Sequence, residues 1–234
     1  MKAREFDCRI RATAIKIDWE DAFWHKIRYV LVNDLIVKSY PRNLLDIGCG
    51  KGIIEYLLPE NIFCLGCDVV EEAIESARLL NQHKKNRQFL VCDIEKALPS
   101  YEKFDVIVIS EVLEHLSDDE KALKKMRNLL EDEGILIITV PNSERIVNQL
   151  SGLLGKPICQ EKSHLREYTV PEITALLNRC RFKTQTAKGI CLQLPKEKYM
   201  PEKFRFAMSF LVDDVVAKKL PFLANSILVV AKKC

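Results

Sequence analysis

The sequence predicts an α/β fold in which helices cover both faces of a mostly parallel sheet. Short apolar runs of strand length alternate along the chain with amphipathic stretches of helix length, and this pattern is typical of repeated strand–helix units. The run Phe104–Ile109 is apolar at all but one position, as expected for a parallel strand covered on both faces. Such sheets bind ligands beyond the carboxyl ends of their strands. A functional site is therefore expected in the loops that follow the strands.

Three kinds of local signal place helices between these strands. A glycine-rich turn follows the first strand, residues 70–82 carry apolar side chains at helical spacing, and the patterns S-x-x-E and T-x-x-E start at Ser117 and Thr169. These signals predict helices at about 51–58, 70–82, 117–130 and 169–179. The strands are expected at Asn43–Ile47, Ile62–Cys67, Gln88–Cys92, Phe104–Ile109, Gly134–Val140, Arg181–Gly189 and Ser226–Ala231, with Pro141 ending the fifth.

Three segments fall outside this alternation. Residues 1–40 form an N-terminal helical segment, because Asp18–Ser39 places Trp19, Phe23, Ile27, Val30, Leu31 and Leu35 on one apolar stripe. Residues 41–234 form the main domain, in which 142–168 and 194–225 are long for plain loops. Long loops in compact domains are often lids or binding elements. We interpret 142–168 as a lid and 194–225 as an insertion whose apolar residues pack on the domain, a lipid-like substrate or a second copy of the chain.

Composition excludes several classes of protein. The 234 residues carry a formal net charge of +3, which is too mild to indicate nucleic-acid binding by itself. No run reaches the roughly 18 apolar residues of a membrane span, and the N-terminus lacks the apolar core of a secretory signal, so a cytoplasmic protein is expected. Nine cysteines without regular spacing do not suggest a disulfide framework. Cys64 and Cys67 point to opposite faces of a strand and are expected to pack in the core.

The glycine-rich turn is the most informative motif. It reads D-x-G-x-G-x-G, with Asp46 followed by Gly48, Gly50 and Gly52. A dinucleotide-binding turn would need glycine where Ile53 stands, and the chain has no phosphate-binding P-loop. Glycines allow a tight turn and a close approach of backbone to ligand, and the helix that follows offers unpaired N–H groups.

This turn resembles the first motif of the class I S-adenosylmethionine-dependent methyltransferases. The resemblance extends in order over residues 40–190, through Asp68, Asp93, the fourth-strand motif at 104–116 and the fifth strand at 134–142. It implies a Rossmann-like sheet of seven strands, mostly parallel with the last strand antiparallel. It also implies methyltransferase activity, with S-adenosylmethionine as cofactor and S-adenosylhomocysteine as product.

The resemblance assigns roles to individual residues. The glycines leave room for the methionine portion of the cofactor, and Asp46 helps to hold its amino group. Asp68 accepts hydrogen bonds from the ribose hydroxyls, and Asp93 contacts the adenine amino group, although an Asp after a strand is also a common helix cap. The cofactor-binding residues implied are Asp46, Gly48, Cys49, Gly50, Gly52, Asp68, Val69, Asp93, Ile94, Ser110 and Glu111.

The reacting end of the site is open to three interpretations. His115 or His164 is a general base that removes a proton from the acceptor, a role suited to imidazole near neutral pH. Alternatively, Glu111, Glu114, His115 and His164 hold a divalent metal ion, as in the small-RNA 3′-terminal 2′-O-methyltransferases that this set resembles. In the third interpretation these side chains only cap a helix, pair with charges or anchor the lid. Of these interpretations we favour the first, with His115 and His164 as catalytic residues and no metal ion.

The sequence indicates the methyl acceptor less clearly than it indicates the cofactor. The leading hypothesis is O- or N-methylation of a small molecule, sugar or lipid intermediate. An RNA acceptor is the main alternative, since basic residues cluster in Lys156–Arg166 and Lys196–Arg205, although no RNA-binding module is apparent. A third hypothesis is a non-catalytic cofactor-binding subunit that joins a partner through 194–225. A nicotinamide-dependent dehydrogenase is disfavoured by Ile53.

Overall fold

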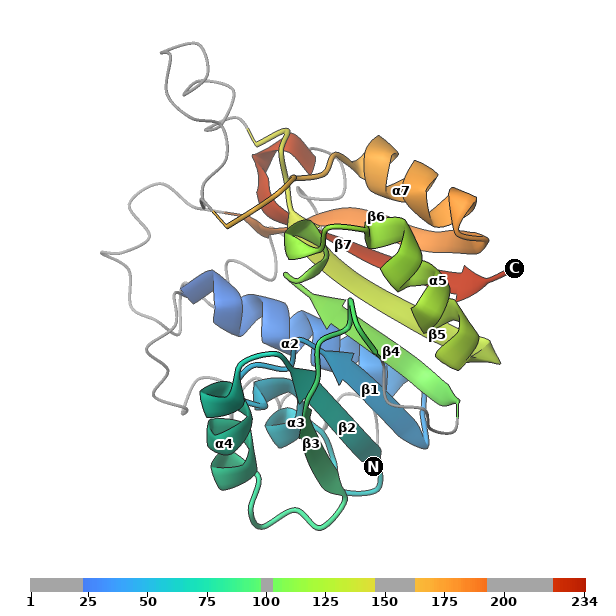
Figure 1. Cartoon of the computed structure of the whole chain (residues 1–234). Coiled ribbons are helices and arrows are strands. Elements are labelled where there is room, and N and C mark those ends of the chain that lie inside the picture. Colours follow the sequence, from blue (N-terminus) through green and yellow to red (C-terminus); the bar gives the residue numbers. More distant parts are fainter. Residues whose placement is uncertain (1–22, 98–102, 146–162, 193–220) are drawn as a thin grey trace.

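A computed structural model describes residues 23–97, 103–145, 163–192 and 221–234 of the chain (Figure 1). The start of the predicted N-terminal helix, most of the predicted lid and most of the predicted insertion lie outside these residues, as do the cluster Lys196–Arg205 and most of Lys156–Arg166. The predictions for these segments therefore remain predictions.

The described chain forms a seven-stranded sheet in the order β3-β2-β1-β4-β5-β7-β6. Neighbours from β3 to β5 are parallel, whereas β7 is antiparallel to both β5 and β6. The predicted α/β class and the antiparallel last strand are thus confirmed. The strands are β1 Asn43–Ile47, β2 Phe63–Asp68, β3 Arg87–Val91, β4 Phe104–Ser110, β5 Leu130–Pro141, β6 Phe182–Leu192 and β7 Ala224–Lys233.

Helices cover both faces of the sheet, as Figure 1 shows. On one face, α2 and α3 bury Ile27, Ile36 and Ile54 against Leu44 and Val106 of the central strands. On the other face, α5 and α7 bury residues such as Leu123 and Ile173. The helices are α2 Phe23–Lys38, α3 Ile53–Leu57, α4 Glu71–Leu80, α5 Asp119–Leu129 and α7 Val170–Arg179, with short 3-10 turns η1 Leu113–His115 and η4 Pro221–Leu223. Among the described residues, no helix combines the length and apolar character needed to cross a membrane.

The apolar stripe predicted for α2 is only partly correct. Ile27 and Val30 are buried, but Leu31 and Leu35 are only partly buried. Arg28 and Asn33 are buried instead, which places polar groups in the contact of this helix with the sheet. A buried guanidinium needs a partner, and that partner lies at the end of β4.

One of the two predicted capping boxes is wrong. The N-cap of α5 is Asp118, whose carboxylate accepts a hydrogen bond from Lys121 N at 2.9 Å, whereas the Ser117 hydroxyl donates to Glu95. Asp118 takes the cap because Ser117 is already engaged with a distant loop. The box of Thr169 and Glu172 at the start of α7 is confirmed in both directions.

The strands after α5 are longer than predicted. β5 starts at Leu130, directly after the helix, rather than at Gly134. Leu130 is buried and pairs with Phe104 of β4. The acidic residues between Leu130 and Gly134 resemble a turn in sequence; of these, Glu133 pairs with Lys232 and Asp132 with Lys233 on β7.

Removing the α7 cap should destabilise the protein measurably. We expect Thr169→Ala to lower the free energy of unfolding by about 1 kcal/mol, because Glu172 N loses its acceptor. Thr169→Ser keeps the hydroxyl and should stay within a few tenths of the wild-type value. Urea unfolding followed by circular dichroism measures both, and an equal loss in the two variants would contradict the capping role.

Candidate functional site

The loop after β1 is built from alternating left-handed glycines. Gly48, Gly50 and Gly52 have φ of 74°, 53° and 71°, a region that other residues enter only with strain. The N–H groups of Gly48 and Cys49 both donate to Cys67 O of β2, at 2.7 and 3.0 Å. The loop is therefore fixed to the neighbouring strand.

The glycines differ in what surrounds them. A side chain at Gly48 would overlap Val112, which follows β4, and one at Gly52 would lie 2.9 Å from Ala77 on α4. A Cβ at Gly50 would meet no atom within 4 Å. Gly48 and Gly52 thus serve the packing of the loop, and Gly50 borders open space that a ligand can enter.

Asp68, at the end of β2, ties this loop to the next helix. Its carboxylate accepts hydrogen bonds from Gly50 N and Val70 N, both at 2.9 Å. The side chain is only partly buried, and a carboxylate with two acceptors filled still has lone pairs for ligand hydroxyls. Val69 beside it is 65% exposed. The structural role and the predicted ligand role of Asp68 are therefore compatible.

Asp93 and Ile94 form a tight turn after β3. The Asp93 carboxylate accepts from Glu95 N at 3.0 Å and pairs with Lys96 at 3.1 Å, and these contacts lower its pKa. Lys125 of α5 donates to Ile94 O at 2.8 Å. The turn is held in place, and the Asp93 carboxylate is engaged within it, although no helix of the described chain starts there.

Asp46 lies beneath the glycine loop, where it faces a second carboxyl group. Asp46 is 1% exposed and Glu55 of α3 is fully buried. Neither carboxyl accepts a hydrogen bond from any other group in the described chain. Burial and the proximity of the two acids raise the pKa of Asp46 well above its usual value, and burial raises the pKa of Glu55 to about 7. Two facing carboxyl groups cannot both ionise at low energetic cost, so the fully ionised form of this pair is disfavoured in the folded chain.

The exit of β4 brings a partly buried acid, Glu111, to the edge of the sheet. Glu111 has φ of 56°, an uncommon value for a residue other than glycine. Its N–H donates to Thr139 O at 2.9 Å, and its carboxylate lies 3.6 Å from the Arg28 guanidinium of α2. Ser110, just before it, shares a 2.8 Å hydrogen bond with Thr139. Strained backbone of this kind concentrates at functional sites.

The predicted catalytic residues His115 and His164 come together in space. Their ring centroids lie 4.9 Å apart at an interplanar angle of 68°. His115 Nδ1 lies 3.1 Å from Ser163 O, and His164 Nδ1 lies 3.3 Å from the Glu167 carboxylate. Both Nδ1 partners are acceptors, a geometry that suits an imidazole with its proton on Nδ1.

Glu114 completes a group of three potential ligands. One ligand atom from each of Glu114, His115 and His164 lies within 4.8 Å of the others. Glu114 is fully buried, and burial together with the charge of Glu111 raises its pKa to about 8. Glu111, the fourth residue of the metal interpretation, is turned towards Arg28 and lies outside this group.

Sequence reasoning missed three buried charged groups here. Glu55 pairs with Asp46, Arg28 pairs with Glu111, and Glu167 contacts His164. Glu167 adjoins His164 in sequence and could have been found from the i, i+3 spacing. Arg28 and Glu55 stand in helices without any motif, so no local signal marks them.

Comparison with known proteins agrees with this architecture. The model of the methyltransferase domain family matches residues 41–216. The ubiquinone biosynthesis O-methyltransferase of Glaesserella parasuis is 31% identical over 126 residues, which cover 50% of this chain and 52% of that protein. The chain thus spans about half the length of this curated relative.

Solved structures show the same fold. The N-methyltransferase NodS from Bradyrhizobium japonicum, in complex with S-adenosyl-l-homocysteine, has a TM-score of 0.63 at 17% identity, over 99% of this chain and 97% of that chain. The small RNA methyltransferase HEN1 has a TM-score of 0.68 at 15% identity, over 93% of this chain and 27% of that chain. At these identities the likeness establishes the fold alone.

The sheet order and the glycine loop define the class I S-adenosylmethionine-dependent methyltransferases, as the resemblance implied. Within that class, the chain belongs to the methyltransferase domain family, whose model covers most of its length. S-adenosylmethionine is the cofactor of this family. The open space at Gly50 and the remaining acceptor capacity of Asp68 fit such a ligand.

Substitutions in the glycine loop should separate folding from binding. We expect Gly52→Ala to lower the unfolding temperature strongly, because the new side chain meets Ala77 and Asn81. Gly50→Ala meets open space and should cost only the backbone strain of about 1–2 kcal/mol, but should weaken binding of S-adenosylhomocysteine at least tenfold. Calorimetric titration and thermal unfolding test this; Gly50→Ala with unchanged affinity would show that no ligand approaches there.

The buried acid pair should make stability depend on pH. The pKa of Glu55 is raised in the folded chain, so between about pH 4.5 and 7 the unfolded chain binds fewer protons than the folded one, and stability falls as the pH rises. Glu55→Gln should remove part of this slope. Urea unfolding across this range measures it, with exposed Glu75→Gln of α4 as the matched control. Equal slopes in wild type and Glu55→Gln would contradict the assignment.

Proposed function

We propose that the chain transfers a methyl group from S-adenosylmethionine to a hydroxyl group of a small-molecule or lipid-intermediate acceptor. The observation that carries this proposal is the pair of imidazoles, His115 and His164, at the carboxyl end of the sheet beside buried Glu114. An oxygen nucleophile gains reactivity when its proton is removed as it attacks. The O-methyltransferase name of the curated relative supports an oxygen acceptor.

We assign cofactor binding to the residues around the glycine loop and the strand ends. S-adenosylmethionine supplies a methyl group already activated by its sulfonium, so the protein contributes mainly position and proton transfer. Gly50 leaves the space and Asp68 offers carboxylate oxygens, whereas Asp46 lies below the loop and acts through it. The proposed set is Asp46, Gly48, Cys49, Gly50, Gly52, Asp68, Val69, Asp93, Ile94, Ser110 and Glu111.

Two mechanisms fit the imidazole pair. In the first, the Nε2 lone pair of His115 or His164 accepts the proton of the acceptor, while Ser163 O or Glu167 orients the ring from Nδ1. In the second, Glu114, His115 and His164 would hold a divalent ion, which would supply Lewis-acid chemistry that lowers the pKa of the acceptor hydroxyl. The closeness of the three potential ligand atoms supports this alternative. Glu114 would have to lose its proton to become a ligand.

The N-terminal segment is proposed to cover the site. The contact of Arg28 on α2 with Glu111, which follows β4, supports this proposal. The lid 142–168 and the insertion 194–225, including its role in forming an oligomer, remain proposals from the sequence. An RNA acceptor remains the competing hypothesis, which the shared fold with HEN1 does not decide.

Methyl transfer with a labelled donor tests the function directly. Purified protein and methyl-labelled S-adenosylmethionine are incubated with organic-soluble, aqueous small-molecule and RNA fractions of cell extract. Label in the organic-soluble or small-molecule fraction supports the proposal, and nuclease-sensitive label supports the RNA alternative. Tight cofactor binding without transfer to any fraction would indicate a non-catalytic subunit.

Single substitutions and a chelator separate the two mechanisms. We expect His115→Ala and His164→Ala each to lower kcat by 10²–10⁴-fold with little change in cofactor affinity. Loss of activity with EDTA, restored by added Mg²⁺ or Mn²⁺, would select the metal mechanism; activity indifferent to EDTA would select a histidine base. Full turnover in both alanine variants would overturn the proposed role of the pair.

A further inference from the structure

His164 is carried by a short strap of irregular backbone. We use strap for Ser163–Thr169, the residues that precede α7. Leu165 N donates to Glu114 O at 3.0 Å, and Ser143 N donates to Tyr168 O at 3.0 Å. Apart from one isolated bridge between Asn142 and Tyr168, the strap has no sheet pairing. Its path over the site therefore depends on its side chains as well as on these few backbone bonds.

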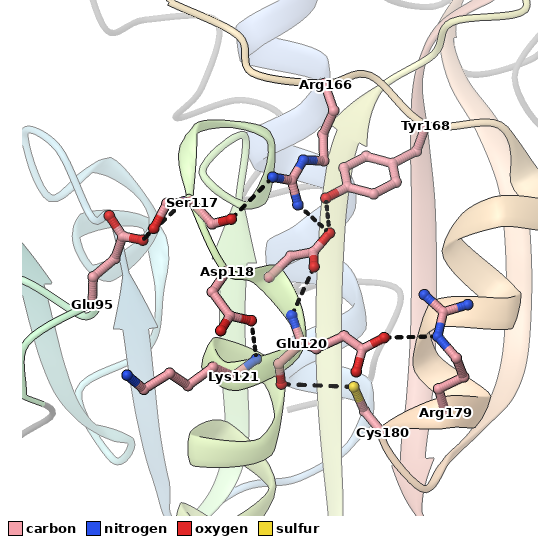
Figure 2. Close-up of polar contacts among 10 residues, drawn as sticks. Glu95, Ser117, Asp118, Glu120, Lys121, Arg166, Tyr168, Arg179 and Cys180 are labelled. Carbon is pink, nitrogen blue, oxygen red and sulfur yellow. Dashed lines mark hydrogen bonds and ion pairs between the residues drawn. The ribbon is translucent and has the colours of Figure 1, made fainter.

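Two strap side chains converge on a single carboxylate of α5. Arg166 Nη1 lies 2.7 Å from Asp119 Oδ2, and the Tyr168 hydroxyl donates to the same oxygen at 2.8 Å. Arg166 also donates to Ser117 O at 3.1 Å. Figure 2 shows Arg166 and the Tyr168 hydroxyl bonded to the same carboxylate, and Arg166 also bonded to Ser117. The two anchored residues flank Glu167, the side chain that contacts His164 Nδ1.

Asp119 is itself a fixed point. It is the first residue of α5, just after the N-cap Asp118. The helix is held to the sheet by Leu123 and Met126, which are both fully buried. Charge-assisted hydrogen bonds of this length are among the stronger polar contacts in proteins. The strap is thus tied to a rigid element rather than to another loop.

We propose that Asp119 is a positioning residue, which holds Arg166 and Tyr168 so that the strap presents His164 to His115 and Glu114. Among the described residues, no hydrogen bond or ion pair joins Asp119 to His164, His115 or Glu114. It acts through the strap. This inference rests on the proposed function, because it takes His164 as a catalytic residue.

A neighbouring ion pair provides a matched control. Glu120, the next residue of α5, accepts a hydrogen bond from Arg179 Nε at 2.7 Å. This pair ties α5 to α7 and does not involve the strap, as Figure 2 also shows. Asp119→Asn and Glu120→Gln each remove one charge from the first turn of the same helix, but only the first releases the strap.

Histidine NMR reads out the position of His164 without requiring turnover. The chain has four histidines, so the ring signals can be assigned with one substitution each. We expect Asp119→Asn to shift the ring signals of His115 and His164 and to leave those of His83 unchanged. Glu120→Gln should move none of them. Unmoved His164 signals in folded Asp119→Asn, or equal shifts in both variants, would overturn the proposal.

Kinetics provide a second readout in the same variants. Displacement of a catalytic group by about 1 Å can lower the rate roughly 10²-fold, so Asp119→Asn should lower kcat by 10- to 100-fold with an unchanged Kd for S-adenosylhomocysteine. Arg166→Lys keeps a cation beside Asp119 and should retain more activity than Arg166→Met.

The remaining outcomes are also informative. If Asp119→Asn does not fold, Tyr168→Phe removes one bond of the clamp and should cause a smaller shift of the same two histidine signals; no shift would count against the clamp. Full turnover in His164→Ala would overturn the proposed function, whereas the NMR shifts would still test the placement of the strap by Asp119.

Discussion

The adjacency of β1 and β4 is the constraint on which the rest of the structure depends. From β1 the chain builds outward through β2 and β3, and from β4 it builds in the opposite direction through β5. The loops after β1 and β4 therefore diverge at the carboxyl edge, the place where open α/β sheets bind ligands. They approach each other at Gly48, where a side chain would overlap Val112. Burial of both faces of the sheet keeps this junction rigid, so the residues at the carboxyl edge extend from a fixed backbone.

Buried charge is concentrated at this edge. Asp46 faces Glu55 below the glycine loop, Glu111 pairs with Arg28, and Glu114 is fully buried beside two imidazoles. Each of these arrangements is less favourable for folding than an apolar contact of the same size. Perturbed ionisation of several groups in one place is typical of functional sites. The same burial that opposes ionisation of Glu114 strengthens any interaction made with a cation or a reacting oxygen.

Much of the fold was predictable because its signals are local. Strand β1 has the predicted bounds, the box at Thr169 forms as expected, and the antiparallel last strand agrees with the resemblance. The failures have a common cause. Ser117 has the pattern of an N-cap, but its hydroxyl is taken by Glu95, so Asp118 caps α5. The acidic residues before Gly134 resemble a turn, but the strand already starts at Leu130, which pairs with Phe104 of β4. In each case a partner distant in sequence outweighs the local preference.

By itself, the sequence determined the order of strands and helices, the positions of the glycines and the family, because periodicity, caps and backbone freedom are properties of neighbouring residues. Only the tertiary structure decided which groups meet. His115 lies beside Ser163, 48 positions away, and Arg28 reaches Glu111 from a helix whose sequence shows no site motif. The raised pKa values of Asp46 and Glu55 also depend on the fold, because water is excluded only after α3 packs on the sheet. Desolvation and long-range pairing are consequences of packing, and no local pattern of residues contains them.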